Sequence, residues 1–381
     1  MLRFLDAGES HGKCLLGIIE GMPAGLLLDE DKINKNLKRR QMGYGRGKRM
    51  EIEKDKVEIL SGVISRKTIG TPIGLMIKNN DWKNVRKQSL SPLSIPRPGH
   101  ADLAGVLKYG FDDCRPVLER ASARQTAMKV AIGSIALQFL EYFNINSYNH
   151  VTRIGSIDVK DQPIFNEEFK NRIQQSNVFC MNKSVSKKMC REIDEAGKNG
   201  DTLGGVFEVA VKGVPVGLGS YVHWDRRLDG RLASVLMSIP GVKAVEIGNG
   251  IEISKQRGSK VHDEIFLSEK KQKIPFKYYR NKNNAGGLEG GISNGEEIFL
   301  RAYFKPIPTL LNPLASVDIK TRKKTKAMYQ RSDICVVPAA SVVGEAMINW
   351  EIAAAFLEKF GGDSLQETEN NFKYYQRGLE K

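Results

Sequence analysis

Two histidines stand in glycine-containing turns from which they could donate protons to a ligand. His11 lies within Gly8-Glu-Ser-His-Gly12, and His100 ends Arg97-Pro-Gly-His100. Glycines let the backbone approach a ligand closely, and a histidine can exchange a proton near neutral pH. The first segment also matches the G-x-S-x-G turn of hydrolases, but that turn follows several strands, and here seven residues precede it. For both histidines, an ordinary surface turn is the alternative.

Arginines and glycines alternate in the segment that follows the first helix. Glycines stand at positions 43, 45 and 47, and the cations around them are Arg39, Arg40, Arg46, Lys48 and Arg49. Arginine makes planar, bidentate contacts with phosphate and carboxylate, and glycine-rich backbone can turn its N–H groups toward an anion. The pattern favours an anion site over a solvated basic surface.

A second pair of arginines, Arg120 and Arg124, is spaced four apart on an expected apolar helix. That spacing puts both on one helix face, where buried cations would need anionic partners. Snorkelling to solvent at the helix start is the alternative.

Three later segments could contact a flat or anionic ligand. Residues 284–293 are rich in glycine but do not fit G-x-G-x-x-G, which argues against a Rossmann site. Lys305-Pro-Ile-Pro-Thr309 ends a strand with a cation and a stiff turn. Asp333 precedes a long apolar helix, where capping is the alternative role. The sequence lacks H-E-x-x-H and Cys/His metal spacings, so we expect no metal site.

The composition is that of a soluble globular protein with an excess of positive charge. Hydrophobic residues make up 41% and charged residues 27% of the 381 residues, and the net charge is +15. Such a balance suits either nucleic acid or small polyanions. We expect no membrane span and no signal peptide, and therefore a cytoplasmic protein. The five cysteines form no C-x-x-C pair and are expected to be reduced thiols.

Periodicity predicts the elements that must position these residues. Asp29 caps an expected helix through Gln41, with Ile33 and Leu37 on its inner face. Two long apolar helices are expected at 116–143 and 339–360. Strands are expected at 2–28, 50–63, 73–77, 206–211, 242–253 and 298–304, with a hairpin turn at 248–250 and loops at 79–99 and 266–284, the latter mobile.

Hairpin-like strand groups with few β-α-β alternations favour an α+β fold, in which antiparallel sheets sandwich the two apolar helices. We expect one domain over residues 1–362, followed by a polar tail at 363–381 that frays.

Taken together, the motifs resemble the chorismate synthase family over Gly8 to about Phe360. The matching segments are Gly8–Gly12, 39–47, 97–102, Lys108–Arg115 with Glu119–Thr126, and Arg331–Ala340. The resemblance implies a β-α-β sandwich, a homotetramer, and an anti-1,4 elimination of phosphate from 5-enolpyruvylshikimate 3-phosphate. Reduced FMN is required, with no net oxidation or reduction. A nucleic-acid-binding protein and an ordinary flavin oxidoreductase are the rival classes.

The resemblance also implies a role for each motif. His11 would protonate near the departing phosphate, His100 near the reduced flavin, and Asp333 would assist deprotonation at flavin N5. The substrate would contact Arg40, Arg46, Arg49, Arg97 and Arg124, although some members assign the positions of Arg40 and Arg46 to NADP. FMN would contact Arg120, Ala121, Ser122, Pro240, Gly241, Gly290, Lys305, Pro306, Ile307, Pro308, Thr309 and Arg331.

Two features distinguish this chain within the resemblance. Ile334 stands where the family usually has proline, so we expect Ile334→Pro to be tolerated. No separate NADPH-binding motif is visible, which favours a monofunctional enzyme whose flavin is reduced by a separate flavin reductase or kept reduced at low oxygen. The basic balance then serves a trianionic substrate and the FMN phosphate, whose repulsion would otherwise cost several kcal/mol.

Overall fold

Two antiparallel sheets and a layer of helices make up most of the fold. The computed structural model describes residues 1–47, 54–80, 82, 92–160, 163, 165–267, 278–327 and 333–379. One sheet has the order β1-β2-β6-β3, with strands Arg3–Ala7, Cys14–Glu20, Ile73–Lys78 and Val57–Ile59. The other has the order β10-β15-β9-β7-β8, with strands Val242–Ile247, Ile298–Phe304, Gly205–Lys212, Asn146–Ile154 and Ile157–Asp158. The expected mixture of helices and strands is confirmed.

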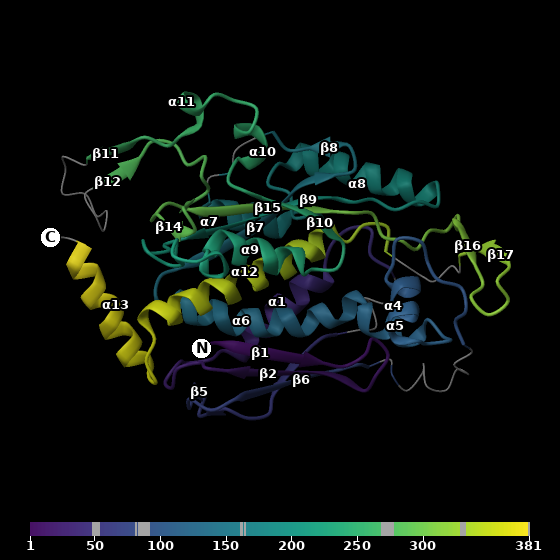
Figure 1. Cartoon of the computed structure of the whole chain (residues 1–381), viewed down its shortest axis with the longest axis horizontal. Helices are drawn as coiled ribbons and strands as arrows, with labels where there is room; N and C mark the ends of the chain where they lie inside the picture. The colour runs from purple at the N-terminus through teal and green to yellow at the C-terminus, as the bar shows by residue number, and fades with distance from the viewer. Residues whose placement is uncertain are drawn as a thin grey trace.

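Helices α6 (Thr126–Tyr142) and α12 (Val337–Phe360) run between the two sheets, with α1 (Glu30–Gln41) beside them (Figure 1). The backbones of α6 and α12 approach closely, because a Cβ atom on Gly133 would lie 2.2 Å from the carbonyl oxygen of Ala346. Asp29 caps α1, and Ile33 and Leu37 are buried, as the sequence predicts.

The remaining elements lie around this core. They are α4 (Asp102–Tyr109), α5 (Arg115–Ala121), α7 (Glu167–Gln175), α8 (Lys183–Lys198), α9 (Leu228–Met237), α10 (Gly250–Ile253), α11 (Gly258–Val261), α13 (Leu365–Leu379), β4 (Val63–Ile64), β5 (Lys67–Thr68), β11 (Ile265–Leu267), β12 (Tyr278–Arg280), β13 (Leu288–Glu289), β14 (Ile292–Ser293), β16 (Ala315–Val317) and β17 (Lys324–Lys326), with 3₁₀ turns η1 (Ala123–Gln125) and η2 (Trp224–Arg226).

Helix α12 is long and apolar enough by composition to cross a membrane, which the sequence reasoning did not anticipate. However, 94% of its most apolar 18-residue window is buried inside the protein. A helix that is apolar on all sides is expected where it packs between layers. Its composition is therefore explained by its place in the core.

The expected helix 116–143 is broken, and this break changes the site. Pro116 lies in the first turn of α5, as expected, but Ser122 is extended (φ −68°, ψ 143°) between α5 and η1. The Ser122 hydroxyl accepts the N–H of Arg124 at 3.3 Å, a local bond that competes with helix continuation. Arg120 and Arg124 consequently do not share a helix face.

The expected hairpin at 248–250 was wrong, and the expected loop at 266–284 was wrong at its ends. The segment 248–250 makes no hairpin, because the Glu246 carboxylate accepts the N–H of Ile251 at 2.9 Å and α10 begins there. The ends of the expected mobile loop 266–284 pair as β11 and β12, whereas residues 268–277 lie outside the described part. Of the expected strand 50–63, β3 and β4 are present, and residues 50–53 lie outside the described part.

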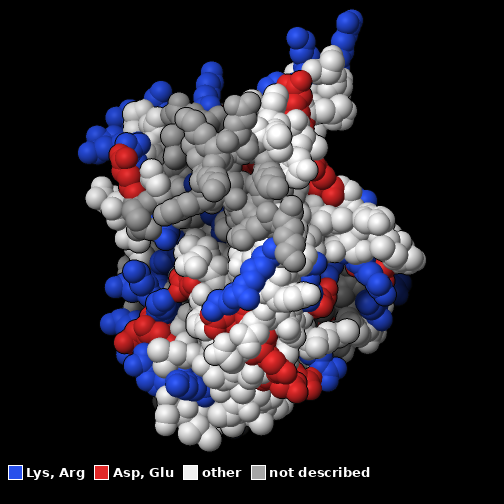
Figure 2. All heavy atoms as spheres, turned by 90° about the vertical axis from the view of Figure 1, so that its left-hand side faces the viewer, with Lys and Arg blue, Asp and Glu red and all other residues white. Residues whose placement is uncertain are grey.

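The C-terminal segment is helical, although we expected it to fray. Leu365 and Phe372 of α13 are buried, and the Phe372 ring lies 5.1 Å from the rings of Phe356 and Phe360. A cavity of about 290 Å³ lies between α13 and the end of α6. Figure 2 views the molecule from the side on which α13 lies, and on this face Lys and Arg side chains are interspersed with Asp and Glu.

Candidate active site

A partly buried carboxylate holds His11 in place. Glu119 of α5 accepts the backbone N–H of His11 at 2.7 Å and contacts its ring Nδ1 at 2.8 Å. Burial would raise the pKa of Glu119, but the hydrogen bonds from the His11 ring and backbone lower it overall. The same turn contacts the helix break, since the Ser122 hydroxyl donates to the Ser10 hydroxyl at 3.1 Å. The turn 8–12 and the 119–122 segment therefore form one unit.

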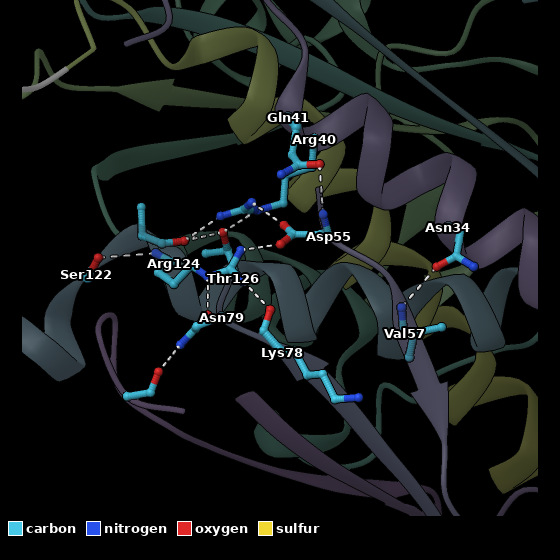
Figure 3. Close-up of polar contacts among 12 residues, drawn as sticks. Asn34, Arg40, Gln41, Asp55, Val57, Lys78, Asn79, Ser122, Arg124 and Thr126 are labelled. Carbon is cyan, nitrogen blue, oxygen red and sulfur yellow. Dashed lines mark hydrogen bonds and ion pairs between the residues drawn. The ribbon is translucent and has the colours of Figure 1, made fainter. Parts of the chain in front are cut away.

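Next to this unit, Asp55 lies between Arg40 and Arg124 (Figure 3). The carboxylate accepts from Arg124 Nη1 at 2.5 Å and from Arg40 Nη1 at 3.5 Å. Asn79 accepts from Arg124 Nε at 2.8 Å, and its own amide donates to the carbonyl of Gly12 at 2.8 Å. Burial, opposed by Asp55, lowers the pKa of Arg40 to about 10. Both arginines are nearly buried, with their guanidinium groups held by protein acceptors.

The arginine-glycine segment reaches the same region. Arg46 Nη1 lies 3.3 Å from the Asp333 carboxylate, which also accepts the N–H of Gly47 at 2.5 Å. Arg46 and Asp333 both act electrostatically on Arg40. The N–H of Ile334 donates to the carbonyl of Gly45 at 2.8 Å, a bond that proline could not make. The expectation that proline fits freely here therefore no longer holds.

The second histidine lies in a compact charged turn. Asp102, at the start of α4, accepts from the Arg97 backbone and from its Nε and Nη2 atoms at 2.8–3.0 Å. Its carboxylate also contacts His100 Nδ1 at 2.5 Å. Burial opposes ionisation, but these bonds from His100 and Arg97 hold the pKa of Asp102 well below its usual range.

The turn at 97–100 lies against the 305–309 segment. Lys305 Nζ donates to the carbonyl of Gly99, and the Lys305 N–H donates to the carbonyl of Gly241 at 2.9 Å. Burial, with a smaller contribution from Lys243, lowers the pKa of Lys305. Thr202 donates to the carbonyl of Ile307 at 2.7 Å, and Thr309 is buried. His100, Pro240-Gly241 and 305–309 are thus brought together.

Contacts through residues 202–204 join these parts. The N–H of Leu203 donates to the carbonyl of Ile334, and Gly204 packs against the backbone of residues 304–306. Helix α4 packs on α5, because a Cβ atom on Gly105 would lie 2.6 Å from the side chain of Val117. The 97–102 turn therefore contacts the 305–309 segment directly, and it is linked to Asp333 through residues 202–204 and Ile334 and to the 119–124 segment through the packing of α4 on α5.

Not every expected residue joins this group. Gly290 lies in the β13–β14 turn, and β14 is at the opposite end of the molecule from α4 and α5 in Figure 1. Arg120 faces Asp6 and the carbonyl of Gly8, with a half-exposed side chain. Arg39 points into the core and pairs with Glu345 at 3.0 Å, away from the anion site. Arg49 and Arg331 lie outside the described residues.

Comparisons with known proteins identify the family. The sequence model of chorismate synthase matches residues 2–357. A chorismate synthase from Alkaliphilus metalliredigens (strain QYMF) is 53% identical over 384 residues, covering 98% of this chain and 99% of that protein. One from Caldicellulosiruptor saccharolyticus is 52% identical, covering 99% and 100%. A crystal structure of a chorismate synthase superposes with a TM-score of 0.81 at 42% identity, covering 99% of this chain and 98% of that one.

The chain belongs to the chorismate synthase family. It is accordingly a lyase that acts on a small-molecule substrate, which resolves the choice left open by its basic composition.

Sequence reasoning missed several residues that hold the chorismate synthase motifs together. Asp55, Asn79, Asp102 and Glu119 each bind a motif arginine or histidine directly. Asp102 and Glu119 stand inside quoted motifs, and their acidic side chains beside a histidine or arginine were an available signal. Asp55 and Asn79 carry no comparable signal, because they meet Arg124 only through the fold.

Proposed function

We propose that the chain converts 5-enolpyruvylshikimate 3-phosphate to chorismate by anti-1,4 elimination. The C3–O bond to phosphate and a C6–H bond break, a second ring double bond forms, and phosphate and a proton leave. The observation that carries the proposal is family membership over nearly the whole chain, with the matched signatures in order. Aromatic amino acid biosynthesis, through the shikimate pathway, is the metabolic setting that this reaction implies.

His11 and His100 are proposed as general acids. His11 would hold a proton for the departing phosphate, and Glu119 would keep its Nδ1 atom fixed. His100 would hold a proton near the flavin, with Asp102 fixing the same ring atom. Asp333 would accept a proton at flavin N5, and its pairing with Arg46 supports a defined position. A positioned acid typically contributes about 10²–10⁴ in rate.

Arginines are proposed to bind the phosphate and the two carboxylates of the substrate. The proposed set is Arg40, Arg46, Arg49, Arg97 and Arg124. Contacts through Asp55 and Asp333 connect three of these, and a pair of guanidinium groups close together suits a multiply charged anion.

The described residues fit a flavin mononucleotide over most of the proposed set. Gly99 and Gly241 have φ values of +76° and +101°, which favour glycine, and a Cβ atom on Gly99 would lie 3.4 Å from Lys305 Nζ. Lys305 and the buried Thr309 offer donors suited to a phosphate, Ser122 contacts Ser10 beside His11, and Arg120 contacts the carbonyl of Gly8 in the same turn. Gly290 is remote from this group, and the half-exposed Arg120 faces Asp6. When bound, reduced FMN would supply electron density transiently to the departure of phosphate and recover it.

Turnover with chemically reduced flavin tests this function. With pre-reduced FMN under anaerobic conditions, chorismate should accumulate in large excess over flavin, because the reaction consumes no electrons. Oxidised FMN should support no turnover in the matched control. Product limited to one equivalent per flavin would show instead that the flavin is consumed, as in an oxidoreductase.

Several related proposals accompany the reaction. We infer a homotetramer in the cytoplasm, a β-α-β sandwich built from the two sheets and the helices between them, and a flavin reduced by another protein rather than by this chain. Light scattering of the purified protein checks the assembly. NADPH oxidation by the purified enzyme with FMN would argue for self-reduction of the flavin, in which case Arg40 and Arg46 become candidates for the NADP contact.

A further inference from the structure

Asp55 is a buried carboxylate shared by two arginines, and it belongs to none of the recognised motifs. Its side chain has no exposed surface. One carboxylate oxygen accepts from Arg124 at 2.5 Å, and the other lies 3.5 Å from Arg40. The N–H of Asp55 donates to the side chain of Gln41 at 3.2 Å. One residue therefore connects the end of α1, the start of β3 and the η1 turn (Figure 3).

The other nitrogens of the two guanidinium groups also have fixed acceptors. Arg40 Nε donates to the Thr126 hydroxyl at 3.0 Å, and its Nη2 donates to the Ala123 carbonyl at 2.9 Å. Arg124 Nε donates to Asn79 at 2.8 Å. A guanidinium has five N–H donors, so the three contacts described for Arg40 leave it capacity for a ligand. The orientation of both planes is thus set before any ligand arrives.

The shared carboxylate also matters for charge. Asp55 neutralises at least one of the two guanidinium charges in a largely dry place. Arg46 and Asp333 act on Arg40 with opposite signs. Because a buried charge is unfavourable without a partner, Asp55 stabilises the two guanidinium groups in these orientations.

We propose that Asp55 is a positioning residue of the substrate site. It fixes the directions of Arg40 and Arg124, two of the arginines proposed to bind the substrate. This inference rests on the proposed function, since a substrate with a phosphate and two carboxylates is the ligand that these arginines would meet.

Asp55→Asn tests the inference because a positioning role and a simple charge effect predict opposite changes in KM. If Asp55 acted through its charge alone, its removal would make the site more positive, and KM for 5-enolpyruvylshikimate 3-phosphate would fall. If Asp55 positions the arginines, KM should rise about 10- to 100-fold, the loss expected when a charge-assisted hydrogen bond is misdirected. The value of kcat should change less, by about threefold at most, because uniform binding is what is lost.

Glu345→Gln provides a matched control. Glu345 lies on α12 and pairs with Arg39, the residue next to Arg40, at 3.0 Å, and its side chain is 8% exposed. This variant also removes a buried carboxylate from an arginine at the end of α1, but on the core side. Like Asp55→Asn, it should lower the free energy of unfolding by removing a buried ion pair, but KM should stay within about twofold of wild type.

KM and kcat are measured anaerobically with pre-reduced FMN, and the substrate dissociation constant is measured by calorimetry. A rise in KM and in the dissociation constant for Asp55→Asn, with Glu345→Gln unchanged, supports the positioning role. An unchanged or lower KM overturns it, and so does an equal rise in both variants.

A further variant covers the case in which Asp55→Asn does not fold. Asp55→Glu retains the negative charge and displaces the carboxylate by one methylene. A higher KM for Asp55→Glu supports the role, and wild-type KM overturns it. Failure of the wild-type enzyme to form chorismate is a separate result, which would refute the proposed function instead.

Discussion

Replacing Glu119 by glutamine should loosen His11 without removing it. In the wild type, one carboxylate accepts from both the backbone N–H and the ring Nδ1 of His11, at 2.7 and 2.8 Å. Glutamine keeps one acceptor oxygen and turns a donor toward the other partner. A hydrogen bond to a charged group contributes about 1.5–3 kcal/mol, so we expect the free energy of unfolding to fall by about that amount.

The effect on catalysis should exceed the effect on binding. The Nδ1 contact selects the ring tautomer and orientation, and Glu119→Gln permits the other tautomer. If His11 is a general acid, kcat should fall about 10- to 100-fold, part of the 10²–10⁴ that such a group supplies, with KM changing by less than about threefold. Asp225→Asn is a matched control, because Asp225 makes the same Nδ1 contact with His223 at 2.7 Å on the exposed surface.

Denaturant unfolding across pH gives a second measurement for the same variant. The folded pKa of Glu119 lies below its ordinary value of 4.5, so its contribution to stability is present above that pH and lost as pH falls through the folded pKa. The wild type and Glu119→Gln should therefore differ at pH 6–8 and converge below about pH 4.5. Wild-type kcat in a folded Glu119→Gln enzyme would refute the reasoning, as would a difference in stability independent of pH.

Three further changes have definite expected outcomes. Ile334→Pro should lower the free energy of unfolding by about 1–3 kcal/mol, because the N–H that donates to Gly45 is lost; an unchanged melting temperature would contradict this. Asp102→Asn should lower the free energy of unfolding by about 1.5–3 kcal/mol above pH 5. The difference from wild type should shrink below about pH 4, because the pKa of Asp102 is lowered in the folded protein and protonation removes its contribution to stability. Gly241→Ala should destabilise the protein and weaken FMN binding, because the residue has a φ of +101° and its new Cβ atom would lie 2.3 Å from the Phe304 ring. Gly230→Ala is the control: its Cβ atom would meet open space in α9, so the free energy of unfolding should rise by up to about 1 kcal/mol. Calorimetry and FMN titration compare the two variants.

Sequence patterns predicted the structure correctly where it depends on residues close together in the chain. The cap of α1 at Asp29 and its inward Ile33 and Leu37 follow from side chains within one or two turns. The break at Ser122 was missed because the apolar run continues past it, and the competing bond from the serine hydroxyl is invisible to periodicity. A serine just before the residue whose N–H it accepts was the available clue.

For contacts between residues far apart in the sequence, the chemical type of the partner could be predicted, but the partner residue could not. Burial of Arg124 implied an anionic partner, and Asp55 is one such partner. Yet Asp55 lies 69 residues from Arg124 and is one of four acidic residues between positions 51 and 58. To predict which of the four pairs with Arg124, one needs the register of β3, and the alternation of polar and apolar residues does not determine that register.

The carboxylates beside the motif arginines limit what those arginines can do for a substrate. Four described arginines and the three acidic partners described for them leave at most one positive charge among them: Arg40, Arg46, Arg97 and Arg124 against Asp55, Asp102 and Asp333. A trianionic substrate beside an FMN phosphate needs more, since each close unpaired repulsion costs about 4 kcal/mol at an effective dielectric of 20. The remaining neutralisation must come from cations without such a partner or from the protons that His11 and His100 would carry. Lys305 is one such cation, with its Nζ on a backbone carbonyl rather than on a carboxylate, and Arg49 and Arg331 are the other sequence candidates. The paired arginines would therefore orient the substrate through directed hydrogen bonds, and other cations in the site would supply the net positive charge that binds it.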